Sequence, residues 1–324
     1  MATPVIPAPG TSAPAPRPFR FGVQAGGTMD RKGWVELARR VEQQGYSTLT
    51  LPDHFDDQFS PVPALMAAAD ATERLRVGSL VWDNDYRHPV VLAKELATLD
   101  VLSDGRLEIG IGAGWMRTDY EAAGMTYDRP GVRVDRLVEG LAVLKGCFGS
   151  EAFSFAGEHY TITDYDGRPL PAQRPWPPFL IGAGGPRMLA IAAREADIVG
   201  INATLTTGAI DGTTLASMMA EAVDQKVAAL RAAAGNRMAE IELNIRTFFV
   251  KVTNERAATL DGIAKMTGQT PEAIAESPFA IVGTVAQIAD ELRQRRARWG
   301  FSYVIVGAAE VDDMAPVVAE LAGT

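Results

Sequence analysis

The tetrapeptide PDHF, residues 52–55, sets a carboxylate beside an imidazole. Its histidine, His54, is one of only three in the chain, and Asp53 precedes it directly. A free imidazole has a pKa of about 6.5, so His54 could donate or accept a proton near neutral pH. These four residues alone are more typical of a buried structural histidine. Proton chemistry at Asp53 and His54 is therefore a prediction that needs support from the rest of the chain.

Two glycine-rich turns form a second candidate site. The segments GIGAG (110–114) and GAGG (182–185) each end an apolar run, and Pro186 and Arg187 follow the second. Glycines at a strand-to-helix turn leave backbone N–H groups at the helix N-terminus open to an anion. Pro186 suits a first helical turn, and Arg187 could pair with phosphate. One such turn is equally compatible with tight packing, but two favour a phosphate-bearing cofactor. Neither segment completes a P-loop or the dinucleotide fingerprint.

These candidates lie where predicted strands end. Strands are predicted at 19–24, 47–55, 76–82, 106–115, 178–185, 196–202, 241–253 and 302–308. Helices are predicted at 34–45, 63–75, 90–103, 134–148, directly after the second glycine turn, at 211–234, 257–276, 283–300 and 314–322. Eight strand–helix units with strands rich in Ile, Val and Leu favour a closed (β/α)₈ TIM barrel over an open, doubly wound sheet. Active sites of such barrels lie at the C-terminal ends of the strands.

The pattern predicts one domain behind a short arm. Residues 1–18 are rich in proline and alanine, which predicts an extended, disordered arm rather than a signal peptide. Residues 19–324 show no shift in composition, so they are expected to form a single barrel domain. The residues beyond a typical barrel are placed in insertions at about 150–178 and 203–280.

Composition excludes several classes of function. The chain has 324 residues, 47% of them hydrophobic, and its 31 Lys and Arg against 40 Asp and Glu give a net charge of −9. Such an acidic chain has no footprint for nucleic acid or anionic lipid. Cys147 is the single cysteine, which excludes disulfide frameworks and cysteine-based metal sites, and no spacing of histidine with carboxylates indicates a metal. No apolar run is long enough to span a membrane, and a cytoplasmic location is expected.

Three blocks in order carry a more specific signal than any single motif. They are PDHF, then RVGSLV…YRHPVVLAKELATLDVLSDGRLEIGIGAGW, then PPFLIGAGGPRMLAIAAREADIVG. Together they resemble the luciferase-like monooxygenase superfamily, and within it the actinobacterial group of coenzyme F420-dependent oxidoreductases. The resemblance spans roughly residues 19–310. It implies a TIM barrel that holds a flavin or a deazaflavin at its C-terminal mouth.

The resemblance also assigns residues. It implies a non-prolyl cis peptide at Leu80–Val81 that backs the central ring of the cofactor, and it makes His54, with Asp53, the best candidate for proton handling beside that ring. The implied cofactor-binding residues are Ser79, Leu80, Val81, Ala113, Gly114, Ala183, Gly184, Gly185, Pro186 and Arg187. Gln24, Trp82 and Trp115 are expected to line the substrate pocket.

One departure from the family pattern concerns Trp115. In the sugar-phosphate dehydrogenase branch, a catalytic glutamate stands at this position, so that branch's acid–base pair is incomplete here. Activity on glucose 6-phosphate becomes doubtful. The tryptophan is compatible with an apolar or aromatic substrate, with packing against the cofactor, and with simple core packing.

Three functions remain open from the sequence. The resemblance implies hydride transfer between C5 of the deazaflavin and a small organic substrate, with reduction of an activated C=C or an imine as the net reaction. The alternatives are an FMN-dependent monooxygenase, which would need a reductase partner to supply reduced flavin, and a non-catalytic cofactor-binding barrel. The resemblance also implies a homodimer formed through the early helices.

Overall fold

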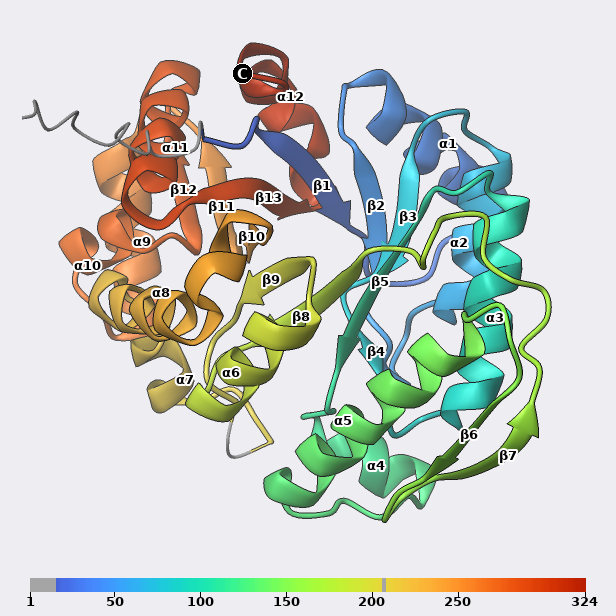
Figure 1. Cartoon of the computed structure of the whole chain (residues 1–324). Helices are drawn as coiled ribbons and strands as arrows, with labels where there is room; N and C mark the ends of the chain where they lie inside the picture. Colours follow the sequence, from blue (N-terminus) through green and yellow to red (C-terminus); the bar gives the residue numbers. More distant parts are fainter. Residues whose placement is uncertain (1–15, 206–207) are drawn as a thin grey trace, which may run out of the picture.

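Strands rich in Val, Ile and Leu, each followed by a helix, close into a parallel barrel (Figure 1). The computed structural model describes residues 16–205 and 208–324, so the first fifteen residues of the predicted arm lie outside the described part. Neighbouring strands follow the order β3, β2, β1, β13, β10, β9, β8, β5, and β5 pairs back with β3. All pairings in this sheet are parallel, and the predicted (β/α)₈ barrel is confirmed.

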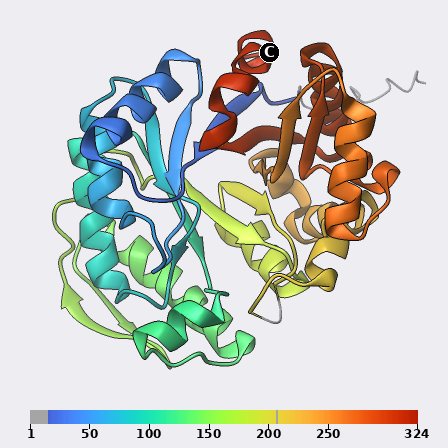
Figure 2. The same cartoon turned by 180° about the vertical axis from the view of Figure 1, so that it is seen from behind.

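The barrel strands are β1 (Arg20–Gln24), β2 (Thr48–Leu51), β3 (Arg76–Ser79) with β4 (Trp82–Asp83), β5 (Leu107–Gly112), β8 (Phe179–Ala183), β9 (Ile198–Ile201), β10 (Glu242–Arg246) and β13 (Phe301–Gly307). The helices are α1 (Arg31–Gln43), α2 (Pro61–Asp70), α3 (Pro89–Leu102), α4 (Arg117–Ala123), α5 (Pro130–Cys147), α6 (Pro186–Glu195), α7 (Gly212–Ala216), α8 (Ala220–Ala234), α9 (Arg256–Thr267), α10 (Pro271–Glu276), α11 (Val285–Trp299) and α12 (Val311–Leu321). Seen from behind, α1 to α3 and α9 to α11 cover opposite sides of the barrel (Figure 2).

Two excursions carry small sheets of their own. The segment predicted as a hairpin at 150–178 contains the antiparallel strands β6 (Phe153–Ala156) and β7 (Thr161–Tyr165). The second sheet pairs β11 (Phe249–Val252) with β12 (Ala280–Gly283) in parallel. Both lie outside the barrel sheet.

The prediction of one strand over 241–253 is wrong. The chain leaves the barrel ladder at Thr247, whose N–H and hydroxyl both donate to the carbonyl of Ile305. The next two N–H groups, of Phe248 and Phe249, donate instead to the carbonyl of Phe279. The same apolar run therefore serves two sheets, which periodicity alone could not reveal. Likewise, the predicted helices at 211–234 and 257–276 are each two helices in the structure.

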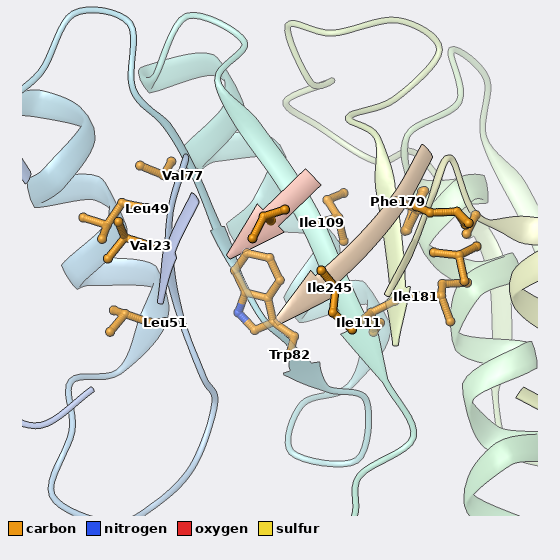
Figure 3. Packing of buried hydrophobic residues seen from close by; sticks show 14 of the residues in the cluster. Val23, Leu49, Leu51, Val77, Trp82, Ile109, Ile111, Phe179, Ile181 and Ile245 are labelled. Atoms are coloured by element: carbon orange, nitrogen blue, oxygen red, sulfur yellow. The ribbon is translucent and has the colours of Figure 1, made fainter. Parts of the chain in front are cut away.

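Side chains alternate between two buried layers along each strand. The outer layer packs between the barrel and its helices, and Figure 3 shows Val23, Leu51, Ile109 and Ile181 within it. The inner layer fills the barrel and includes Leu180, Ile198, Tyr303 and Ile305. Alternation with period two thus decides which residues at a strand's C-terminal end face the interior of the mouth.

A network of charged side chains lies at the N-terminal ends of the barrel strands, at the end opposite the mouth. Arg20 donates to Glu108 at 2.6 Å and to Glu242 at 2.7 Å, and Arg76 donates to Glu108 at 2.8 Å. The Arg20 guanidinium also lies 3.5 Å from the centre of the Tyr303 ring. Burial alone would raise the pKa of Glu108, but the two arginines outweigh it and hold that pKa below its usual value.

We expect Glu108→Gln to lower the free energy of unfolding by about 3 kcal/mol, because it leaves two partly buried arginines without their shared carboxylate. Urea unfolding at pH 7 measures this loss. The Glu108 pKa is lowered in the fold, so the stabilisation is present above the unfolded pKa and is lost as pH falls through the folded one. The difference between the two proteins should therefore shrink in acid. Glu36→Gln is the matched control, because its exposed pair with Lys32 is worth about 0.5 kcal/mol or less. Equal losses of unfolding free energy in Glu108→Gln and Glu36→Gln would contradict the stabilising role given to the Glu108 network.

Candidate active site

His54 meets a carboxylate from a helix that the sequence did not predict. Nδ1 of His54 lies 2.7 Å from Oδ2 of Asp119, which is buried in the first turn of α4. An acidic residue suits that turn because the N–H groups there are unpaired, and Gly124 ends the helix in the left-handed conformation. Tyr86 donates its hydroxyl to the same carboxylate oxygen at 3.0 Å. Two donors therefore fix Asp119, and Asp119 in turn fixes the orientation of the His54 ring.

The other ring nitrogen of His54 is left for chemistry. With Nδ1 bound to Asp119, Nε2 has no hydrogen-bond partner within residues 16–205 and 208–324. Trp115 stands edge-on to the imidazole, with ring centres 5.8 Å apart. A carboxylate therefore stands four residues after Trp115, at Asp119, and it contacts His54 directly. Together these residues can hold a proton on Nε2 in a defined direction.

Asp53 is held in a different way. Arg87 donates to Oδ2 at 2.6 Å and to Oδ1 at 3.2 Å, and the N–H of Asp83 donates to Oδ2 at 3.2 Å. Asp53 is buried, and Arg87 lies two residues before α3. Both carboxylate oxygens are occupied by a permanent cation, which suits a positioning role better than the proton exchange predicted for Asp53.

A second carboxyl pair lies beneath the first glycine turn. Tyr120 directs its hydroxyl at Asp83 (3.1 Å) and Asp85 (3.1 Å), and Arg136 pairs with Asp85 at 2.9 Å. Burial raises the pKa of Asp83 to about 7, and the negative charges of Asp85 and Asp53 add to this, although hydrogen bonds from the Asp85 N–H and Tyr120 oppose it. Asp83 therefore changes its charge near neutral pH at the edge of the mouth.

The third barrel strand is interrupted as the family resemblance implied. The peptide bond between Leu80 and Val81 is cis, and it separates β3 from β4. Ser79 donates its hydroxyl to the carbonyl of Leu51 at 2.8 Å, and the Leu80 N–H donates to the same carbonyl. The Val81 side chain occupies the space beside Gly112, where an added Cβ would lie 2.9 Å from it. Leu80 and Val81 are both half-buried and pack against the side chains that fill the barrel, so they form its inner face at this point.

The second glycine turn contains glycines of two kinds. A Cβ on Gly184 would lie 2.2 Å from the carbonyl oxygen of Ala203, so packing alone requires this glycine. Gly185 faces open space, has an ordinary extended conformation and stands at the N-cap of α6 without a side-chain cap. Pro186 occupies the first helical position as predicted, and Arg187 pairs with Asp135 of α5. The N–H groups of this first turn are therefore available to an anion.

Not every predicted residue reaches the mouth. Trp82 is fully buried in the layer between barrel and helices (Figure 3), because strand alternation turns it outward. The structure therefore does not support a place for Trp82 in the substrate pocket. Ala183 points the same way, which leaves only its backbone for a ligand. Ala113 is half-buried, and Gly114 has a φ of 73° with Tyr120 and Asp83 against it.

Several functional groups were missed by the sequence analysis. Tyr86 and Arg87 lie in the quoted block YRHPVV but were given no role, and Asp119 lies in the overlooked helix α4. The acidic residue in a first helical turn and Gly124 at the helix end were the available signals. Among the described residues no group of three or more His, Cys, Asp or Glu could hold a metal ion. No described helix is long and apolar enough to cross a membrane.

Fold and site define a (β/α)₈ barrel whose mouth combines an oriented histidine, an interrupted third strand and an open helix N-terminus. The chain belongs to the luciferase-like monooxygenase family, whose model matches residues 17–303. It is 30% identical over 168 residues to an FMNH2-dependent dimethylsulfone monooxygenase of Pseudomonas putida, covering 50% of this chain and 46% of that protein. It is 30% identical over 174 residues to an F420-dependent glucose-6-phosphate dehydrogenase of Amycolatopsis mediterranei, covering 50% and 51%. The chain thus spans about half the length of these relatives.

A solved structure extends the likeness over the whole fold. The coenzyme F420-dependent tetrahydromethanopterin reductase of Methanopyrus kandleri superposes with a TM-score of 0.75. The match covers 94% of this chain and 99% of that one at 19% sequence identity. At this identity the comparison supports the architecture of the barrel with its insertions.

Proposed function

We propose that the chain is a coenzyme F420-dependent oxidoreductase that reduces an activated C=C or an imine. The observation that carries this proposal is the His54–Asp119 pair after the C-terminal end of β2, which leaves the other ring nitrogen of His54 without a hydrogen-bond partner among the described residues. F420-dependent relatives at about 30% identity support the choice of cofactor. When bound, the deazaflavin would supply the hydride.

The protein's own residues would bind the cofactor, orient it and move a proton to the substrate. The turn at Gly185 would hold a phosphate through the N–H groups of α6, and the face at Leu80 and Val81 would back the ring system. His54 Nε2 would deliver a proton to the substrate, and Asp119 would stabilise the imidazolium that delivers it. Trp115 would keep water from the ring nitrogen. The arrangement thus separates hydride supply from proton supply.

An FMN-dependent monooxygenase with a separate reductase partner is the second candidate, because the Pseudomonas putida relative uses FMNH2. The deciding experiment titrates the full chain with F420 and FMN, oxidised and reduced, and follows the tryptophan fluorescence. We expect micromolar binding of F420 and at least about tenfold weaker binding of FMN, a difference of 1.4 kcal/mol. The opposite preference would replace the proposal with the monooxygenase. Tight F420 binding without reduction of any activated C=C or imine would favour a non-catalytic barrel.

We further propose a homodimer formed through α2 and α3. An apolar groove between these helices includes Val62, Met66 and Leu99, and Leu102 beside it has 59% of its surface exposed. Lys94 and Glu95 also line this groove, so charged groups would border the apolar contact, and a twofold contact there would use the same patch on both subunits. Sedimentation equilibrium tests this, and a mass of one chain at micromolar concentration would reject it.

We also propose a cytoplasmic location, which the buried, unpaired Cys147 supports.

A further inference from the structure

Arg246 is a cation at the barrel mouth that no described carboxylate contacts directly, although Glu310 lies nearby. It is the last residue of β10, and it forms no ion pair with any carboxylate of residues 16–205 and 208–324. Nε donates to Oε1 of Gln24 at 2.7 Å, and Nη1 donates to the carbonyl of Thr247. Nη2 has no acceptor in that part of the chain. A partly buried guanidinium with an unpaired N–H group has lost contacts with water that no protein group replaces. A bound anion would supply the missing hydrogen bond and the opposite charge.

The barrel register directs this guanidinium into the mouth. Asn244 faces Gly200 across the strand pair, so Arg246, two residues further on, projects on the same inner face. On the other side, Gly307 pairs with Gln24, and a Cβ on Gly307 would lie 3.3 Å from Nη2 of Arg246. Glycine at position 307 therefore keeps the space that the side chains of Glu310 and Arg246 occupy.

Gln24 ties Arg246 to the interrupted strand opposite. Its amide Nε2 donates to the carbonyl of Leu80 at 2.7 Å, while its Oε1 accepts from Arg246. In the ring of eight strands, β10 lies four steps from β3, which is the opposite side of the barrel. The Gln24 side chain therefore links Arg246 to the strand that carries the cis peptide, and a ligand of Arg246 would approach the unpaired Nη2 rather than the side bonded to Gln24.

An exposed aromatic ring stands beside the cation. Phe248 has 54% of its surface exposed, its ring centre lies 5.0 Å from the Arg246 guanidinium, and it stacks on Phe279 at 6.1 Å. Stacking on a buried ring holds Phe248 in place although it faces solvent. An anchored apolar ring next to an unpaired guanidinium matches a ligand that joins an apolar group to an anion.

We propose that Arg246 and Phe248 form the substrate subsite for a carboxylate conjugated to an aromatic or unsaturated apolar group. This proposal rests on the proposed function for its redox step, in which the substrate is an α,β-unsaturated acid. A hydride from the reduced deazaflavin would add to the β-carbon and a proton to the α-carbon, so that C=C becomes CH–CH and the cofactor is oxidised by two electrons. Gln24, predicted to line the substrate pocket, would orient Arg246 through its hydrogen bond with Nε.

Glu310 is the carboxylate that a substrate must compete with. Its Oε2 lies 2.4 Å from the position of a Cβ on Gly307, on the side where Nη2 of Arg246 also lies. Burial lowers the pKa of Arg246 to about 10, and the charge of Glu310 opposes that shift. Because this pKa still lies well above 7, the Arg246 guanidinium remains charged at pH 7. A substrate carboxylate would thus bind against weak repulsion from Glu310.

The test uses cinnamate and its neutral amide, cinnamamide, as probes of the full chain without cofactor. Calorimetric titration at constant ionic strength is expected to show cinnamate binding about tenfold more tightly than cinnamamide, or 1.4 kcal/mol. Arg246→Gln should remove that preference while cinnamamide binding stays within about twofold, since only the charge pair is lost. Phe248→Ala should weaken both probes. Equal binding of acid and amide to the unaltered chain would overturn the proposal.

Three further variants keep the outcome interpretable. Glu310→Gln should strengthen cinnamate binding and leave cinnamamide unchanged, whereas weaker cinnamate binding would contradict the subsite. Gly185→Asp should leave cinnamate binding intact, and its loss there would place the acid at the α6 turn instead. If Arg246→Gln does not fold, Arg246→Met and the Glu310 variant provide the same comparison. If the unaltered chain prefers cinnamate to cinnamamide but does not bind F420, the proposed function alone is rejected. If it binds F420 but shows no preference for cinnamate, the subsite alone is rejected.

Discussion

Gly185→Asp is expected to abolish F420 binding and to leave the fold intact. The new carboxylate would stand at the N-cap of α6 and accept the N–H groups of the first turn, which are the donors that we assign to the cofactor phosphate. It would also place a negative charge at the phosphate position. Losing charge-assisted hydrogen bonds worth roughly 1.5–3 kcal/mol each predicts a fall in affinity of at least about 100-fold.

The same variant should be slightly more stable than the original chain, although it binds F420 less well. Gly185 has open space around its Cβ position and an extended backbone, so a side chain fits without strain. Capping by aspartate should raise the free energy of unfolding by a few tenths of a kcal/mol. Gly185→Ala is the control, because it adds a Cβ without charge and should bind F420 within about threefold of the original chain. Unchanged F420 affinity in the aspartate variant, measured by fluorescence titration, would remove the phosphate assignment.

The barrel could be predicted because its signals are local and repeat eight times. Strands buried on both faces are almost continuously apolar, and each is followed by an amphipathic helix. The same regularity placed PDHF and both glycine turns at strand ends, where they are found. The interruption at Leu80–Val81 has no such signal, and only the family resemblance implied it.

The rest of the site could not be predicted because its partners come from loops that follow different strands, here β2 and β5 on either side of β3. His54 follows β2 and Asp119 follows β5, and 65 positions of sequence separate them. Arg87 reaches Asp53 from the segment before α3 in the same way. Periodicity reports which face of an element is buried and carries no information on which loops meet. Trp82 is a different case: it was expected in the mouth because it stands near the end of a strand, although alternation turns its side chain outward.

The two carboxylates near His54 show how geometry separates similar residues. Asp53 is adjacent in sequence and was the natural partner, but Arg87 occupies both of its oxygens. Asp119 is distant in sequence and holds the imidazole directly. In the proposed mechanism, proton handling would therefore depend on a residue that the motif does not contain. The motif supplies the imidazole, and the fold supplies its charge partner.

His54→Ala is expected to lower kcat by about 100-fold or more, because it removes the positioned proton donor. KM and the F420 affinity should change by less than about threefold, since neither the α6 turn nor the Arg246 subsite is altered. Asp119→Asn should lower kcat by a smaller factor, about tenfold, because the imidazole stays but loses its charged partner. Steady-state kinetics with reduced F420 separate kcat from KM in each variant. Equal losses in kcat and in cofactor affinity would demote His54 to a structural contact.

The double variant decides whether Asp119 acts through His54. If it does, His54→Ala with Asp119→Asn should be no slower than His54→Ala alone, because the carboxylate then has no imidazole to orient. Asp119→Glu should recover part of the lost rate, since it restores the charge with one more methylene. Tyr86→Phe is the matched comparison, because it removes the other donor to the same carboxylate oxygen but keeps the charged Asp119–His54 pair, so its loss should be smaller than that of Asp119→Asn. Additive losses in the double variant would instead mean that Asp119 supports α4 and the mouth independently of His54.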